Sequence, residues 1–219
     1  PAGEFTDDTE LMLCHVESLV SSGGMVDPEG TGRRFLRVAR GEGGRFLGRT
    51  TRLALERAEE TDDFQAGIAG DWPAGSGVAM RIAPVGLVHA LGRFNPEVFT
   101  RDVLRAGLIT HSDPEALNGG LAMAYAVRLL ATREVPPELL IPEVAAFIDE
   151  DNVARRLRLA GELTGRGGDP ERDLANLERI GTSGYVAEAV AAACYCFVTH
   201  PDDFTAAVLT AVNAGGDTD

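Results

Sequence analysis

The sequence predicts an all-α protein, and three observations support this fold class. Apolar residues recur with helical spacing along most of the 219 residues, as Leu11, Val16 and Leu19 do. No segment shows the strict apolar–polar alternation of a half-buried strand, and β-branched residues are sparse. The connections between periodic segments are short and marked by Gly or Pro. Because no repeat or linker divides the chain, we expect one compact, orthogonal multi-helix domain over residues 1–219.

The first half of the chain predicts two buried helices separated by a looser region. The first helix follows Thr6, a residue type that commonly caps helices, and acidic residues come directly after it. The glycine-rich stretch 21–48 is predicted to be a surface excursion with one short helix near 33–40. Residues 78–91 are mostly apolar and predict a buried helix, with Pro84 kinking it or marking its first turn.

The second half predicts a series of helices with clear boundary signals. A long, Ala-rich helix begins at Asp113 and Pro114, since Pro suits a first helical turn, and runs to Leu130. Pro136 and Pro137 end it. Five further helices are predicted, over residues 138–148, 152–163, 170–180, 185–198 and 201–213.

The charge balance excludes several function classes. The chain has 20 Lys and Arg residues against 34 Asp and Glu residues, which gives a net charge of −14, and every one of the 20 is Arg. Such a chain repels phosphate backbones and anionic lipids, so we expect neither nucleic acid nor a membrane as its partner. The absence of Lys excludes P-loop phosphate binding, Schiff-base chemistry and a Lys general base.

Cysteine usage indicates a reducing compartment. Cys194 and Cys196 are two positions apart in a helical run, so their side chains point to different faces. No second pair of ligands completes a zinc site. We therefore expect buried thiols in the cytoplasm, and we see no signal peptide or membrane-spanning segment.

Four acidic clusters are candidates for chemistry. Thr6, Asp7 and Asp8 lie at a helix start, where they either cap the helix or offer oxygen ligands to Mg²⁺ or Mn²⁺. Asp217 and Asp219 follow a glycine stop, and they form either a metal-binding D-x-D pair or an acidic turn. The other two clusters, at 149–151 and 202–203, are interpreted as helix junctions and caps.

Three further features suggest an anionic ligand, each with an ordinary structural alternative. Gly75, Ser76 and Gly77 precede a predicted helix and either seat a phosphate or form a tight turn. His111 either donates to a phosphate oxygen or packs locally. Tyr185 either stacks on a base or belongs to the core.

The order and wording of these stretches together resemble the ADP-ribosylglycohydrolase family, which includes the dinitrogenase-reductase-activating glycohydrolases and the ADP-ribosyl-acceptor hydrolases. The matching stretches span nearly the whole chain: F-T-D-D-T-E (5–10), G-R-T-T-R (48–52), G-S-G-V-A-M-R-I-A-P-V-G-L (75–87), T-H-S-D-P (110–114), G-Y-V-A-E (184–188) and H-P-D-D-F…A-V-N-A-G-G-D-T-D (200–219). The resemblance implies an all-α fold with two Mg²⁺ or Mn²⁺ ions. Ser76 stands where the family pattern has Asn. The family pattern also extends past both ends, so we expect the natural protein to be longer.

The resemblance also implies roles for particular residues. It implies a metal site at Thr6, Asp7, Asp8, Asp217 and Asp219. It implies contacts with the ADP-ribose at Gly75, Ser76, Gly77, His111, Gly184 and Tyr185. Asp8 and Asp71 are the candidate catalytic groups. Because the ligand carries two phosphate charges and the protein is acidic, we also expect local positive potential from metal ions, helix N-termini or Arg81.

The implied function is hydrolysis of the N- or O-glycosidic bond between ADP-ribose and a modified amino-acid side chain, in a protein or a small conjugate. A first alternative is an inactive member that binds nucleotide or serves structurally, as the family's lens-crystallin relatives suggest. A second alternative is a helical scaffold whose acidic motifs are all caps.

Overall fold

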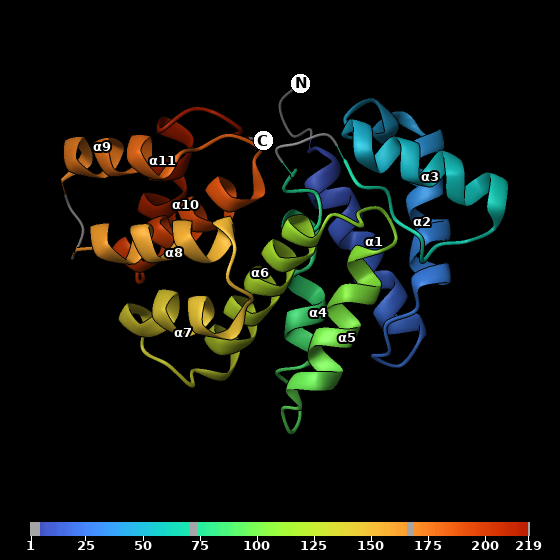
Figure 1. The fold of residues 1–219 in the computed structure, drawn as a ribbon, viewed down its shortest axis with the longest axis horizontal. Coiled ribbons are helices and arrows are strands. Elements are labelled where there is room, and N and C mark those ends of the chain that lie inside the picture. The colour runs from blue at the N-terminus through green and yellow to red at the C-terminus, as the bar shows by residue number, and fades with distance from the viewer. Residues whose placement is uncertain (1–4, 71–73, 166–168, 219) are drawn as a thin grey trace.

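Helices joined by short loops make up the fold (Figure 1). The computed structural model describes residues 5–70, 74–165 and 169–218. In these ranges the α-helices are α1 (Asp7–Ser21), α2 (Pro28–Arg40), α3 (Arg49–Thr61), α4 (Ala83–Val88), α5 (Pro96–Gly107), α6 (Pro114–Thr132), α7 (Leu140–Phe147), α8 (Asn152–Leu163), α9 (Pro170–Ile180), α10 (Val186–Thr199) and α11 (Phe204–Asn213). Three short 3₁₀ turns complete them: η1 (Glu42–Arg45), η2 (Ala79–Arg81) and η3 (Pro137–Leu139).

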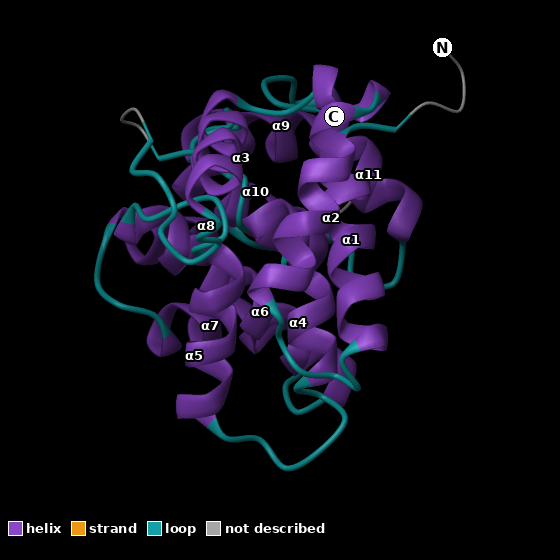
Figure 2. Cartoon of the chain, turned by 90° about the vertical axis from the view of Figure 1, so that its right-hand side faces the viewer, coloured by secondary structure: helices purple, strands orange, loops and turns teal. Residues whose placement is uncertain are grey.

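The helices form two groups around a central one. In Figure 1, α1, α2 and α3 lie on one side, α7 to α11 lie on the other, and α4, α5 and α6 lie between them. The view turned by 90° shows helices and loops without a strand in the described ranges (Figure 2). The prediction of an all-α fold is therefore confirmed. None of the described helices combines the length and apolar content that crossing a bilayer requires.

Polar residues at the N-caps explain where most helices begin. At six helices the side chain of an Asp or Asn residue accepts a hydrogen bond from a backbone N–H of the first turn, which satisfies a donor that the helix itself leaves open. These caps are Asp27, Asn95, Asp113, Asp151, Asp169 and Asp203. The interpretation of the clusters at 149–151 and 202–203 as caps is thus confirmed.

Four segments differ from the sequence prediction. The single buried helix expected over 78–91 is wrong: the structure has η2 followed by the six-residue α4. Pro84 lies in the first turn of α4, which confirms one of the two expected roles, because a residue without an N–H is tolerated there. The helix expected near 33–40 begins earlier, at Pro28, and the two helices α3 and α5 were not predicted.

Buried side chains form two hydrophobic clusters that α1 connects. The larger cluster surrounds α6, α8 and α10 and includes Leu19 of α1. The smaller cluster lies among α1, α2 and α3 and includes Leu11 and Cys14 of the same helix. All three cysteines are buried and free, as expected. That residues 1–219 form a single domain stays a prediction.

Candidate active site

A cavity with a volume of about 310 Å³ lies where six segments of the chain meet. It brings together most of the site residues that the sequence indicated. These are Asp7, Asp8, Gly75, Ser76, Gly77, His111, Gly184 and Asp217. Asp71 and Asp219 lie outside the described residues, so their places in the site stay predictions.

Two isolated β-bridges hold the cavity walls in register. The first joins Ile68 to His111 in parallel, with the Ile68 amide donating to the Thr110 carbonyl at 3.0 Å. The second joins Gly75 to Tyr185 in antiparallel, with the Ser76 amide donating to the Gly184 carbonyl at 3.0 Å. The Ser76 amide is therefore occupied by the protein, and a phosphate seat at residues 75–77 stays a prediction for the amides of Gly75 and Gly77.

Carboxylates from both ends of the chain face this cavity. Asp7 and Asp8 come from the first turn of α1, and Asp217 comes from the segment after α11. The backbone amide of Asp217 donates to the Thr182 carbonyl at 2.8 Å, which fixes the place of this residue. A Cβ added to Gly184 would lie 2.7 Å from the Asp217 carboxylate, so a larger residue there would have to displace this side chain.

The Thr6 hydroxyl does not cap α1. Thr6 is the N-cap residue of α1, but its side chain makes no capping hydrogen bond and lies 3.4 Å from Asp8 Oδ2 instead. Capping therefore does not explain the Thr6 hydroxyl, whereas Asp7 and Asp8 lie in the first turn of α1, where negative charge is favourable. Asp7 and Asp8 line the cavity, and Thr6 directly precedes them without lining it. A hydroxyl and carboxylates are the oxygen donors that Mg²⁺ and Mn²⁺ prefer, so the chemistry of these donors fits such an ion. No group of three His, Cys, Asp or Glu side chains with metal-binding geometry forms among the described residues.

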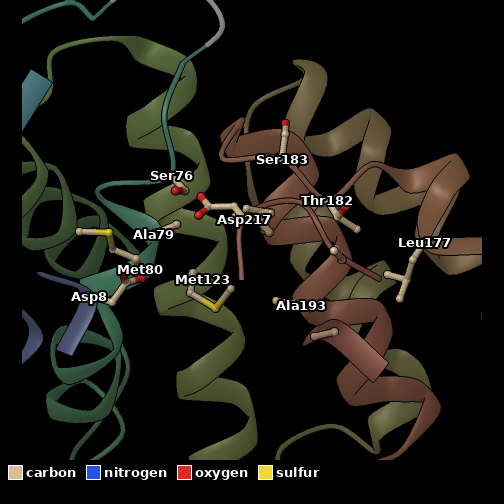
Figure 3. A pocket seen from close by; sticks show the side chains of 15 residues that line it. Asp8, Ser76, Ala79, Met80, Met123, Leu177, Thr182, Ser183, Ala193 and Asp217 are labelled. Atoms are coloured by element: carbon tan, nitrogen blue, oxygen red, sulfur yellow. The ribbon is translucent and has the colours of Figure 1, made fainter. Parts of the chain in front are cut away.

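An apolar chamber of about 270 Å³ adjoins the cavity (Figure 3). The two share Asp8, Ser76, Met80 and Asp217. The far side of the chamber is lined by apolar side chains such as Leu177 of α9. In Figure 3 the Asp217 carboxylate points toward Ser76 and away from Leu177. The carboxylates thus lie between a polar cavity and an apolar chamber.

A fully buried arginine lies behind the wall of the cavity. The side chain of Arg81 is 0% exposed; it donates to the Gly77 carbonyl and, at 2.6 Å, to Thr110 Oγ1, and it packs over the Phe35 ring. Burial lowers the pKa of Arg81 to about 9, and the charge of Asp7 opposes this shift. Arg81 thus carries a positive charge near the site, as the sequence suggested, from a position outside the cavity lining.

His111 is fixed between this arginine and the cavity. Its Nδ1 lies 2.8 Å from Thr110 Oγ1, and the ring packs so closely on Gly77 that an added Cβ there would lie 2.7 Å from His111 Cε1. Burial, with a further contribution from the charge of Arg81, lowers the pKa of His111 to about 3. The imidazole is therefore neutral at pH 7.

Tyr185 lies outside this cavity. It lines a separate hollow with Asn152, Arg155 and Arg156, and burial is the largest of the effects that raise its pKa to about 12. The β-bridge explains the difference, because successive residues of an extended segment point to opposite sides. Gly184 therefore faces the cavity while the Tyr185 side chain points away from it.

Sequence reasoning missed the cavity wall formed by the start of α3. Arg49, Thr50 and Thr51 line the cavity, and Thr51 Oγ1 lies 3.7 Å from the place of a Cβ at Gly77. The G-R-T-T-R stretch belongs to the family resemblance, but it carried no assigned role. The available signal was a pair of threonine hydroxyls two residues after Gly48, at a helix start.

The comparisons with known proteins agree with the resemblance. A family model described as ADP-ribosylglycohydrolase matches residues 1–219. The chain is 31% identical to an uncharacterized protein of Archaeoglobus fulgidus over 100% of this chain and 68% of that protein. It is 28% identical to the ADP-ribosylarginine hydrolase Tri1 of Serratia proteamaculans over 99% of this chain, and it spans only 56% of that protein.

A solved structure supports the same assignment. The chain superposes on one titled "ADP-ribosylglycohydrolase-related protein complex" with a TM-score of 0.72 and 30% sequence identity, covering 100% of this chain and 67% of the other. The family model, the relatives and the fold thus agree over the whole sequence. The chain belongs to the ADP-ribosylglycohydrolase family.

Proposed function

We propose that the protein is a metal-dependent hydrolase that cleaves the glycosidic bond between ADP-ribose and a modified amino-acid side chain. The observation that carries this proposal is the meeting of Asp7, Asp8 and Asp217, from opposite ends of the chain, at one cavity. The described carboxylates do not by themselves form a metal-binding group of three, so a bound ion would draw them together, with Asp219 as a further donor. The alternative, a helical scaffold in which every acidic motif is a helix cap, is disfavoured. The Thr6 hydroxyl does not cap α1, and Asp217 follows the end of α11 and does not begin a helix.

Thr6, Asp7, Asp8, Asp217 and Asp219 would hold one or two Mg²⁺ or Mn²⁺ ions. Such ions, when bound, lower the pKa of water and polarise hydroxyl groups of a ligand. The residues of the chain supply the rest of the chemistry. Gly75, where an added Cβ would meet no atom within 4 Å, leaves room for a ligand at the wall, and His111 offers it a neutral donor or acceptor.

Asp8 is the candidate proton carrier among the described residues. In the proposed reaction a water molecule adds its oxygen to the anomeric carbon of the ribose and gives a proton to a carboxylate. The bond from this carbon to the side-chain nitrogen or oxygen breaks, and the carboxylate passes the proton of the water to the leaving atom. Asp71 is a second candidate for this role.

We propose arginine as the acceptor side chain, since two relatives are named ADP-ribosylarginine hydrolases. The test measures ADP-ribose release from an ADP-ribosylarginine conjugate with Mg²⁺, with Mn²⁺ and with a chelator, beside calorimetric titration of ADP-ribose. We expect release and binding to disappear with the chelator and release to be lost in Asp8→Asn. The matched control, Asp203→Asn, changes a capping carboxylate far from the cavity and should retain turnover.

Each result of this test has a distinct meaning. Metal-dependent binding of ADP-ribose without release from any conjugate would favour an inactive, nucleotide-binding member of the family. No binding with or without metal would contradict the proposed site.

A further inference from the structure

One direction of the hydrogen bonds behind the cavity wall satisfies every buried donor in them. The guanidinium of Arg81 is a donor only, so Thr110 Oγ1 must accept its hydrogen bond at 2.6 Å. The Thr110 hydroxyl keeps one proton to donate, and it is 0% exposed, so water cannot receive this proton. Among the described residues its remaining partner is His111 Nδ1, at 2.8 Å.

The direction of these bonds fixes the state of His111. An Nδ1 atom that accepts a hydrogen bond carries no proton, so the proton of the neutral imidazole is on Nε2. The nearby charge of Arg81 disfavours a second proton on the ring, in agreement with the low pKa of His111. Nε2 lies on the cavity side, where a Cβ at Gly77 would be 3.0 Å from it.

We propose that Arg81 and Thr110 are positioning residues that hold His111 as the Nε2–H tautomer, so that it donates a hydrogen bond to an anionic oxygen of a ligand. The assignment of the tautomer stands on the apo structure alone. The ligand, a phosphate ester such as ADP-ribose, rests on the proposed function. In this arrangement the charge of Arg81 acts through Thr110 and never touches the ligand.

The tautomer can be read from the imidazole ¹⁵N shifts of the uniformly labelled 219-residue chain without ligand. The chain has four histidines, and His111→Gln identifies the signals of His111. We expect the ¹⁵N chemical shifts of His111 to be those of a protonated Nε2 and an unprotonated Nδ1. These shifts should not change from about pH 5 to about pH 8. A proton on Nδ1 of the wild-type protein would overturn the proposal, whatever the variants do.

Two substitutions at one position separate positioning from packing. Thr110→Val keeps the shape but removes the hydroxyl, and it should shift the His111 signals toward a mixture of tautomers. Thr110→Ser keeps the hydroxyl and should restore the wild-type pattern. Thr199→Val, which removes a buried hydroxyl outside the cavity, is the matched control and should leave the signals of His111 unchanged. Identical spectra for Thr110→Val and the wild type would overturn the proposal.

Binding of ADP-ribose tests the second part of the proposal, the hydrogen bond from His111 Nε2 to the ligand. We expect Thr110→Val to weaken binding in proportion to the loss of the Nε2–H tautomer that the spectra show, by about twofold for an even mixture, and Thr110→Ser to bind as the wild type does. Equal affinity in Thr110→Val and wild type would overturn the role toward the ligand. A wild-type chain with the Nε2–H pattern that binds no ADP-ribose would uphold the tautomer and overturn the proposed function.

Discussion

The imidazole of His111 packs directly against the Cα of Gly77, where a Cβ would lie 2.7 Å from Cε1 and 3.0 Å from Nε2. Gly77→Ala should therefore displace a buried ring and lower the free energy of unfolding by about 1–3 kcal/mol, as overpacked cores do. Urea unfolding followed by circular dichroism measures this change.

Gly75 provides the control for this prediction. A Cβ at Gly75 meets no atom within 4 Å, although the residue lines the same cavity two positions away. Gly75→Ala should change the free energy of unfolding by less than about 0.5 kcal/mol. Equal losses in the two variants would show that the ring does not limit the space at Gly77.

Two aspartates at helix starts should respond to substitution in opposite ways. Asp203→Ala removes a cap whose carboxylate accepts from the Ala206 amide at 2.9 Å, so it should cost about 1 kcal/mol of stability with or without metal. Asp8→Asn removes a charge from a cluster of carboxylates, so in the absence of metal it should leave the Tm unchanged or raised.

Adding Mn²⁺ then separates the two variants. At 100 times its Kd an ion stabilises the wild-type protein by about 2.7 kcal/mol, and Asp203→Ala should keep this gain. Asp8→Asn should lose most of it, as measured by thermal unfolding with and without the ion. A gain that survives in Asp8→Asn would contradict a metal site at the start of α1.

Two buried histidines should make the protein less stable in mild acid. Burial is the main cause that lowers the pKa of His15 and of His111 to about 3, while the unfolded chain has the ordinary value of 6.5. Between these values the unfolded state binds more protons, so stability falls as the pH drops below 6.5. Each histidine should contribute about 2 kcal/mol to the loss between pH 7 and pH 5.

A pair of substitutions isolates this contribution. His15→Gln with His111→Gln should flatten the pH dependence of the free energy of unfolding from about pH 7 to about pH 5, even if it lowers the value at neutral pH. Parallel curves for the variant and the wild type would show that other groups cause the acid sensitivity.

The helix α1 should couple the two hydrophobic clusters during unfolding. Leu19 belongs to the larger cluster, whereas Leu11, which is 0% exposed, belongs to the smaller one. We expect one cooperative transition, with far- and near-ultraviolet circular dichroism changing together. Leu11→Ala should lower stability by about 2–5 kcal/mol and keep the transition single. Two separate transitions would contradict the prediction of one domain.

Helix boundaries were predictable where neighbouring residues form a recognisable start or stop signal. Asp113 with Pro114 and Asp169 with Pro170 mark helix starts that the structure has at the same places. Asn95 and Pro96 give the same signal before α5, but sequence reasoning overlooked it. The helix α3 has a glycine N-cap and a polar composition, so its formation depends on packing that no local pattern reveals.

The site was predictable in composition but only partly in arrangement. The family resemblance indicated Asp7, Asp8 and Asp217, and the structure places them at one cavity. The direction of Tyr185 and the occupied amide of Ser76 both follow from a β-bridge between distant segments, which one segment alone does not encode. The roles of Arg81 and Thr110 likewise depend on a contact across the fold.

The two β-bridges also make the cavity a late and sensitive product of folding. They pair Ile68 with His111 and Gly75 with Tyr185, partners far apart in sequence whose contact requires large loops to close first. The amides of Ile68, Ser76 and Val186, which donate across these bridges, should therefore report by hydrogen exchange whether the walls are assembled. Their protection can be followed without any ligand, which separates an intact architecture from an active enzyme.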